Sequence, residues 1–445
     1  MLKRSNSILI QSAKFLIFAA VFLGSSCSGL SLKESVDSAL QNNPEILIQT
    51  ERIKALEGKV NQSFSEYLPK LNFDAEYGKD YRTPVSYSIL GTNFVLYPDE
   101  AANVINYGAN ISQNLFTGGK LTANFNIAKV NLEIAKEELS RKRQELAYGV
   151  ASAYFNLLRA KRMLDLSLES IDFTEVNLKQ VRNYYGFGKV RKGDLLQAEI
   201  GVAEAELNKI SAEQEMESSK ISFNMLLGKK HGEPITLEET EFNSQETSLP
   251  GYEELLALAL AKRPEWKILN YRKRIGEEEI SLAKSEFYPN LSLNGSASKN
   301  ISDYPNNSLK RDINFWNIYA MFSWNVFNGL KTSNRVKEAR ANLSGIVVNE
   351  EQIKNQIAAE VKEAQLYFDA TRLRIRKART EVELAGENLE LAKQEYREGV
   401  GRNVDLLEAQ AKLTKARLDL FQAQSDFAIA KAKINLAEAE ELLKL

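Results

Sequence analysis

Residues 184–198 read YYGFGKVRKGDLLQA, and residues 396–410 read YREGVGRNVDLLEAQ. In both stretches a glycine, Gly188 or Gly399, lies six positions before an aspartate that two leucines follow. Sequence rich in helix-forming residues flanks each stretch on both sides, and glycine commonly ends a helix. The pattern predicts the same helix-turn-helix tip twice, 211 positions apart, and therefore two long helical hairpins in one chain.

Three further motifs recur in the same order along the chain. They are ALQNNPE at 39–45 with ALAKRPE at 259–265, SEYLPKL at 65–71 with SEFYPNL at 285–291, and NLFTG at 114–118 with NVFNG at 325–329. Recurrence in register predicts an internal two-fold repeat. The expected domains are a first repeat at 30–228, a linker at 229–250 and a second repeat at 251–443.

Each repeat contains two segments in which the apolar period changes from that of a helix to that of a strand. The four predicted strands are 70–82, 104–116, 290–301 and 314–327, and residues 79–103 form a long predicted loop in the first pair. One face of each strand is apolar and the other is mostly Asn, Ser and Gly. Strands of about 9–11 residues with such faces are typical of outer-membrane barrels. A half-buried sheet of a soluble protein also alternates and is the alternative.

The helical hairpins are expected at 118–228 and 329–443. The first helix of each would be about 100 Å long at the usual rise per residue. A helix of that length needs packing along its whole course, which the regularly spaced leucines and alanines would supply.

The N-terminus resembles an export signal. Lys3, Arg4 and Lys14 precede the apolar run 15–23, which is too short to span a bilayer. The following GSSC resembles a bacterial lipoprotein cleavage site, so residues 1–27 are expected to be a signal peptide ending at Cys27, the candidate lipidated residue. Ordinary cleavage near residues 26–29 is the alternative. Either way the mature chain leaves the cytoplasm.

Composition argues against several classes of function. The formal net charge of −1 gives no electrostatic reason to expect nucleic acid as a partner. One histidine and one cysteine make a metal site or a His/Cys nucleophile unexpected, so we predict no cofactor and no enzyme activity.

Four strands cannot close a membrane barrel, and an open sheet would leave unpaired backbone edges in lipid. Copies of the chain must therefore share a barrel. Two copies would give eight strands and a filled interior, whereas three would give twelve strands and a lumen. The small polar residues of the inner face favour three.

The duplicated plan, the Asn-Pro-Glu helix start, the Leu-Pro-x-Leu and Phe-x-Gly junctions and the Asp-Leu-Leu turns resemble the TolC family of outer-membrane channel proteins. The resemblance covers nearly all of residues 30–443. It implies an α+β membrane protein: a homotrimer with a twelve-stranded β-barrel in the outer membrane, four strands per chain, continued by a long α-helical barrel through the periplasm. It also implies passive efflux from an inner-membrane transporter, reached through a periplasmic adaptor protein.

The resemblance also suggests residue roles. Asp405 and Glu408 correspond to carboxylates that narrow the periplasmic aperture of the family. The alternative is helix capping, because Asp194 with Gln197 repeats the arrangement at the other tip and resembles a capping box. The turn residues expected to contact an adaptor are Gly186, Gly188, Lys189, Arg191, Gly399, Gly401 and Arg402, although the glycines would also serve simply to end helices.

Two rival functions stay open. The first is the outer-membrane component of a type I protein secretion system, which uses a similar duct. The second is a lipid-anchored periplasmic coiled-coil scaffold, which would explain the helices but not the four strands.

Overall fold

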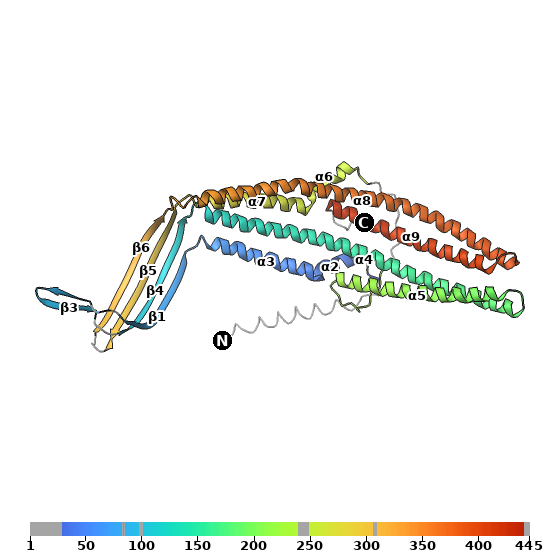
Figure 1. The fold of residues 1–445 in the computed structure, drawn as a ribbon, viewed down its shortest axis with the longest axis horizontal. Helices are drawn as coiled ribbons and strands as arrows, with labels where there is room; N and C mark the ends of the chain where they lie inside the picture. The colour runs from blue at the N-terminus through green and yellow to red at the C-terminus, as the bar shows by residue number, and fades with distance from the viewer. Residues whose placement is uncertain are drawn as a thin grey trace, which may run out of the picture. The chain divides into compact units, whose positions relative to one another are not determined.

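The structure is a computed structural model that describes residues 29–81, 83, 85–97, 101–238, 249–305 and 309–439. Cys27, the candidate lipidation residue, lies outside these ranges. Figure 1 shows long helices and a sheet of long strands. In the first repeat the elements are α2 (Leu32–Asn42), α3 (Pro44–Ser65), β1 (Lys70–Tyr81), β2 (Val85–Ile89), β3 (Thr92–Tyr97), β4 (Ala101–Phe116), α4 (Lys120–Gly186) and α5 (Lys192–Leu226). In the second they are α6 (Tyr252–Lys262), α7 (Pro264–Ser285), β5 (Asn290–Tyr304), β6 (Leu309–Ser323), α8 (Lys331–Glu398) and α9 (Asn403–Glu438).

The chain divides into two compact units, and each unit combines segments of both repeats. Of the described residues, one unit holds those within 1–48, 139–263 and 355–445, and the other holds those within 49–138 and 264–354. A single amphipathic hairpin cannot bury its own apolar stripe, so the helices of one repeat pack with those of the other.

The unit with the helix tips has its main core around Tyr154 of α4 and Phe223 of α5, whose ring centroids are 6.1 Å apart. Val36 and Ala39 of α2 and Ile429 and Ala432 of α9 complete the buried cluster. Ser31 caps α2 through its hydroxyl oxygen, which accepts from the Glu34 amide at 3.3 Å, while the Glu34 carboxylate accepts from the Ser31 amide.

The same unit repeats one contact between its short and long helices. The Asn43 side-chain amide donates to the Leu226 carbonyl at 3.0 Å, and Arg263 Nε donates to the Ala437 carbonyl at 2.9 Å. Asn43 and Arg263 occupy equivalent positions, each directly before a helix-starting proline. The contact thus satisfies a carbonyl near the C-terminal end of α5 and of α9, where carbonyls lack partners within the helix.

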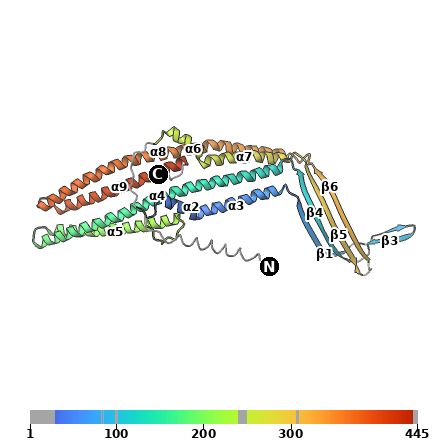
Figure 2. The ribbon, with the colours of Figure 1, turned by 180° about the vertical axis from the view of Figure 1, so that it is seen from behind.

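The other unit contains a four-stranded antiparallel sheet in the order β1-β4-β5-β6, visible from both sides in Figures 1 and 2. β4 of the first repeat pairs with β5 of the second, so β1 and β6 are the free edges. On one face Asn110 donates to Asp74 at 2.9 Å and Ser296 to Asn317 at 2.8 Å. The other face leaves large apolar side chains exposed, among them Leu71, Phe73, Tyr77, Trp316, Ile318 and Phe322.

Helix packing in this unit uses a smaller apolar cluster. Val130 and Ile134 of α4 are buried against Ile268 of α7, with Tyr271 and Ile275 beside them. The Arg335 guanidinium of α8 contacts the Glu286 carboxylate next to the start of β5.

The strand ends differ from those predicted. β6 covers 309–323 rather than 314–327, because Ser323 pairs with Asn290 and Pro289 before it has no amide hydrogen to extend the ladder. β5 continues to Tyr304, where both faces carry polar residues and alternation gives no signal. β4 begins at Ala101, opposite Tyr81.

The predicted loop at 79–103 is also wrong in part. It contains a second hairpin, β2–β3, in which the rings of Tyr87 and Phe94 stack with centroids 5.6 Å apart. Leu90 and Gly91 form its turn with positive φ angles of 51° and 81°, a turn geometry that suits hairpins. Leu90 is an unusual residue for such a position, which is why turn composition did not reveal the hairpin.

Candidate functional site

The two helix turns have the same backbone structure. In the first, the Gly188 amide donates to the Tyr185 carbonyl and the Lys189 amide to the Tyr184 carbonyl, both at 2.9 Å. In the second, the Gly399 amide donates to the Tyr396 carbonyl at 3.2 Å and the Val400 amide to Glu395 at 3.1 Å. Gly188 and Gly399 have φ of 71° and 79°, which any other residue adopts only with strain. Both glycines therefore end their helices in a Schellman motif.

Each return helix begins at an arginine. Arg191 and Arg402 are the N-cap residues of α5 and α9, and Asp194 and Asp405 occupy the third helical position. The Asp194 carboxylate accepts from the Arg191 amide at 3.0 Å, and the Asp405 carboxylate from the Arg402 amide at 3.3 Å. These contacts satisfy an amide that the start of a helix leaves without an internal partner.

The expected capping register is therefore wrong. The two aspartates are not N-caps, and Gln197 and Glu408, one turn further along, are exposed. An acidic residue is favourable at several positions of the first helical turn, so the sequence pattern did not distinguish the N-cap from the third position.

The two turns differ in the arginine side chain. Arg402 Nε lies 3.1 Å from Asp405 Oδ2, and its Nη2 lies 2.8 Å from Oδ1. These hydrogen bonds hold the pKa of the Asp405 carboxyl below its usual value and raise the pKa of Arg402. Among the residues that the structure describes, Asp194 has only the contact with the Arg191 backbone amide. The second turn thus carries an aspartate paired with an arginine side chain, whereas the aspartate of the first turn has no such cation within the described ranges.

The turns lie at the same end of their unit (Figures 1 and 2). Tyr396, which precedes Gly399, has its pKa raised first by burial and then by the nearby Tyr184 and Asp194 of the other turn. Its hydroxyl is buried without a hydrogen-bond partner among the described residues. Asn403, the first residue of α9, is 2 % exposed and its side-chain amide is likewise unpartnered. Sequence reasoning missed Asn403 because asparagine next to a turn has an ordinary explanation.

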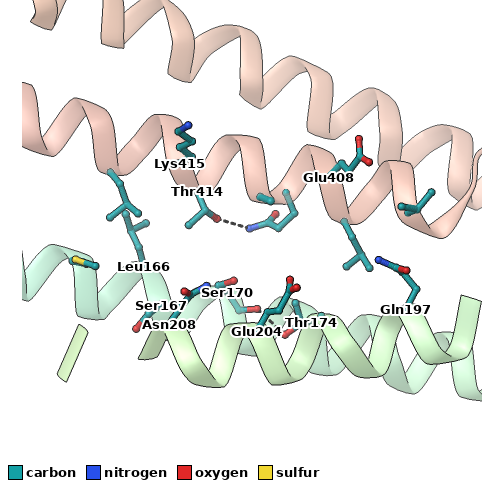
Figure 3. A pocket seen from close by; sticks show the side chains of 18 residues that line it. Leu166, Ser167, Ser170, Thr174, Gln197, Glu204, Asn208, Glu408, Thr414 and Lys415 are labelled. Atoms are coloured by element: carbon teal, nitrogen blue, oxygen red, sulfur yellow. Dashed lines mark hydrogen bonds between the residues drawn. The ribbon is translucent and has the colours of Figure 1, made fainter. Parts of the chain in front are cut away.

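Behind the turns, a groove of about 410 Å³ runs between α4, α5 and α9. Gln197, Glu204 and Glu408 line it, together with Lys415 about two helical turns beyond Glu408. Figure 3 shows the Glu204 carboxylate directed toward α9 and the Glu408 carboxylate directed away from α5. The groove is open and its lining mixes apolar and polar side chains, and its donors and acceptors come from helix faces rather than from a catalytic arrangement.

Most of the remaining turn residues predicted to meet an adaptor are on the surface. Gly186, Lys189 and Arg191 are exposed, and the ammonium of Lys189 lies 5.8 Å from the centre of the Tyr184 ring. Gly401 is half-buried, and a side chain at this position would come within 3.0 Å of Glu395 Cβ.

Two kinds of feature are absent from the described ranges. No group of three or more His, Cys, Asp or Glu side chains there is arranged to hold a metal ion. None of the helices in those ranges is both long enough and apolar enough to cross a membrane.

Solved structures share this fold. The outer membrane protein VceC of Vibrio cholerae is 18 % identical, with a TM-score of 0.75 over 92 % of this chain and 96 % of that one. The open state of the Neisseria gonorrhoeae MtrE outer membrane channel is 18 % identical, with a TM-score of 0.76 over 93 % and 90 %. The chain thus shares its fold with solved outer-membrane proteins, one of them a channel.

Sequence comparison gives the family. Residues 35–229 and 255–439 match the outer membrane efflux protein family, and outer membrane protein TolC of Vibrio cholerae is 22 % identical over 95 % of this chain and 94 % of its own length. The chain belongs to the outer membrane efflux protein family. It is an efflux duct of the outer membrane and not an enzyme, as the sequence predicted.

Proposed function

We propose that three copies of the chain form one duct. Their sheets close a twelve-stranded barrel in the outer membrane, and their helices continue it as an α-helical barrel through the periplasm. The observation that carries the proposal is the sheet itself, which has two free edges, β1 and β6, and one face of exposed apolar side chains. Lipid would cover that face, and pairing β6 of one copy with β1 of the next would satisfy both edges.

In this proposal the duct is the passive outer component of a tripartite system. An inner-membrane transporter supplies the cargo and the energy, and a periplasmic adaptor contacts the exposed turns at residues 186–191 and 399–402. Asp405 and Glu408 lie just past the second turn and would form the acidic rim of the periplasmic aperture. A lipid on Cys27 would add a second anchor in the outer membrane.

Bilayer recording tests the proposal. The full-length protein, extracted from outer membranes, should migrate as a trimer that heating converts to monomer, and should produce discrete conductance steps in a planar bilayer. A water-soluble monomer without conductance would show instead that the chain is a periplasmic scaffold.

A further inference from the structure

The charge pair at the start of α9 has no counterpart at the start of α5. Both oxygens of Asp405 accept from the guanidinium of Arg402, in the two-pronged geometry that joins arginine to a carboxylate most strongly. At the equivalent position of the first repeat, Asp194 accepts from the Arg191 backbone amide and from no other group in the described part of the chain. The difference comes from the arginine side chains, because the two backbones have the same turn and the same cap.

Glu408 follows on the same helix without such a partner. Its side chain is exposed, and in the part of the chain that the structure describes it forms no ion pair. Asp405 is the main cause that raises the pKa of Arg402, and Glu408 is the last of the causes. Lys415 lines the same groove but lies about two helical turns away.

We propose that Arg402 determines the ion preference of the aperture by neutralising Asp405, so that Glu408 alone supplies its uncompensated negative charge. This inference rests on the proposed duct, with the start of α9 at the periplasmic aperture. Arg402, Asp405 and Glu408 then contribute a net charge of −1 per copy rather than −2. The aperture is correspondingly less selective for cations than its two acidic residues suggest.

Removing one member of the pair changes the charge in a defined direction. Arg402→Gln exposes Asp405 and makes the local charge more negative, whereas Asp405→Asn leaves Arg402 unpaired and makes it more positive. One unit charge about 8 Å from the permeating ion changes its local concentration by about twofold in water. Recording in about 0.1 M salt keeps the screening length near that distance.

The experiment measures the cation-to-anion permeability ratio from reversal potentials in a KCl gradient across a planar bilayer. The variants of the full-length trimer are Arg402→Gln, Asp405→Asn, the double variant, and Glu408→Gln. We expect Arg402→Gln to raise the ratio by about twofold and Asp405→Asn and Glu408→Gln to lower it by a similar factor. The double variant should return toward the wild-type ratio, because it removes both charges of a neutral pair.

Arg402→Lys separates the charge from the two-pronged contact, since it keeps the cation but loses that geometry. Its ratio should stay close to that of the wild type. An unchanged ratio in Arg402→Gln, or a double variant that behaves like Asp405→Asn alone, would overturn the inference while leaving the duct intact. A wild-type protein that forms no pore would instead overturn the proposed function and this inference with it.

Discussion

Single glycines have different roles in this chain although their backbone angles agree. Gly188 and Gly228 both have φ of 71°. A Cβ at Gly188 would meet nothing within 4 Å, whereas a Cβ at Gly228 would lie 2.5 Å from the Asn42 carbonyl oxygen. The first glycine serves only its own turn, and the second also allows the end of α5 to approach the end of α2.

Gly228→Ala should therefore lower the thermal unfolding midpoint more than Gly188→Ala. Both variants carry the cost of a left-handed alanine, about 1 kcal/mol, but only Gly228→Ala adds a clash with backbone. Thermal unfolding of the two variants in the same detergent, followed by circular dichroism, measures the difference between their midpoints. Equal shifts would mean that the Asn42 backbone moves aside freely.

At the scale of elements, the buried Arg263 joins three helices. It lies directly after α6, donates to the Ala437 carbonyl of α9, and forms an ion pair with Glu360 of α8 at 2.5 Å. Its side chain is 7 % exposed, whereas that of Glu360 is 43 % exposed. A buried guanidinium needs its counter-charge more than a half-exposed carboxylate does.

Glu360→Ala should thus destabilise the fold by about 2–3 kcal/mol, less than a fully buried pair would lose. Glu363→Ala, one turn along the same helix at an exposed position, is the control and should stay within about 0.5 kcal/mol. Chemical denaturation, followed by the circular dichroism signal of the helices, gives the free energy of unfolding of each variant. A Glu360→Ala variant as stable as its control would show that water replaces the carboxylate.

The two faces of β6 provide a test of lipid contact. Ile318 and Tyr319 are neighbours with 69 % and 49 % of their surface exposed in the single chain, Ile318 on the apolar face and Tyr319 on the opposite one. In water, lysine would be tolerated at either position. In a bilayer, Ile318→Lys should cost about 2 kcal/mol or more, because the charge would enter hydrocarbon, and Tyr319→Lys should cost little.

Yields of folded, heat-modifiable trimer in outer membranes report this difference. Loss of trimer in Ile318→Lys with normal amounts in Tyr319→Lys is the expected result. Equal yields from both variants would favour a sheet that never meets lipid.

For the whole molecule, the strand order limits how copies could join in the proposed duct. In the proposed duct, with β1 and β6 as opposite edges of the sheet, each copy would present a different edge to each neighbour, which is the head-to-tail contact from which a ring is built. A symmetric contact between two β1 strands would leave both β6 edges unpaired.

Cysteines on the two edges test this arrangement. In a Cys27→Ser background, Asn72→Cys on β1 and Tyr319→Cys on β6 should each give no cross-linked product alone with a short bis-maleimide. A chain carrying both should give covalent dimers and trimers and nothing larger. Cross-linking of Asn72→Cys to itself would contradict the head-to-tail ring, and a ladder beyond three chains would contradict the trimer.

Local patterns explain how much of this architecture was predictable. The alternation of residues 71–77 and the glycine before each Asp-Leu-Leu motif depend only on near neighbours, so the sheet and the helix turns followed from periodicity and turn chemistry. The β2–β3 hairpin was missed because Leu90 occupies a turn position that short-range rules assign to glycine or asparagine. The extent of β6 was mispredicted because a strand ends where its neighbour stops pairing, and that neighbour lies elsewhere in the sequence.

The sequence by itself determined the repeat, the two hairpin tips, the amphipathic strands and the family resemblance, because each is a pattern of spacing along the chain. Only the tertiary structure decided that β4 pairs with β5 and that Arg263 binds the end of α9. It also decided that Arg402, and not Asp405, is the N-cap residue of α9, and that the Arg402 side chain binds the Asp405 carboxylate. These contacts depend on which segments meet in space and on side-chain directions within one helical turn, and residue spacing does not specify either.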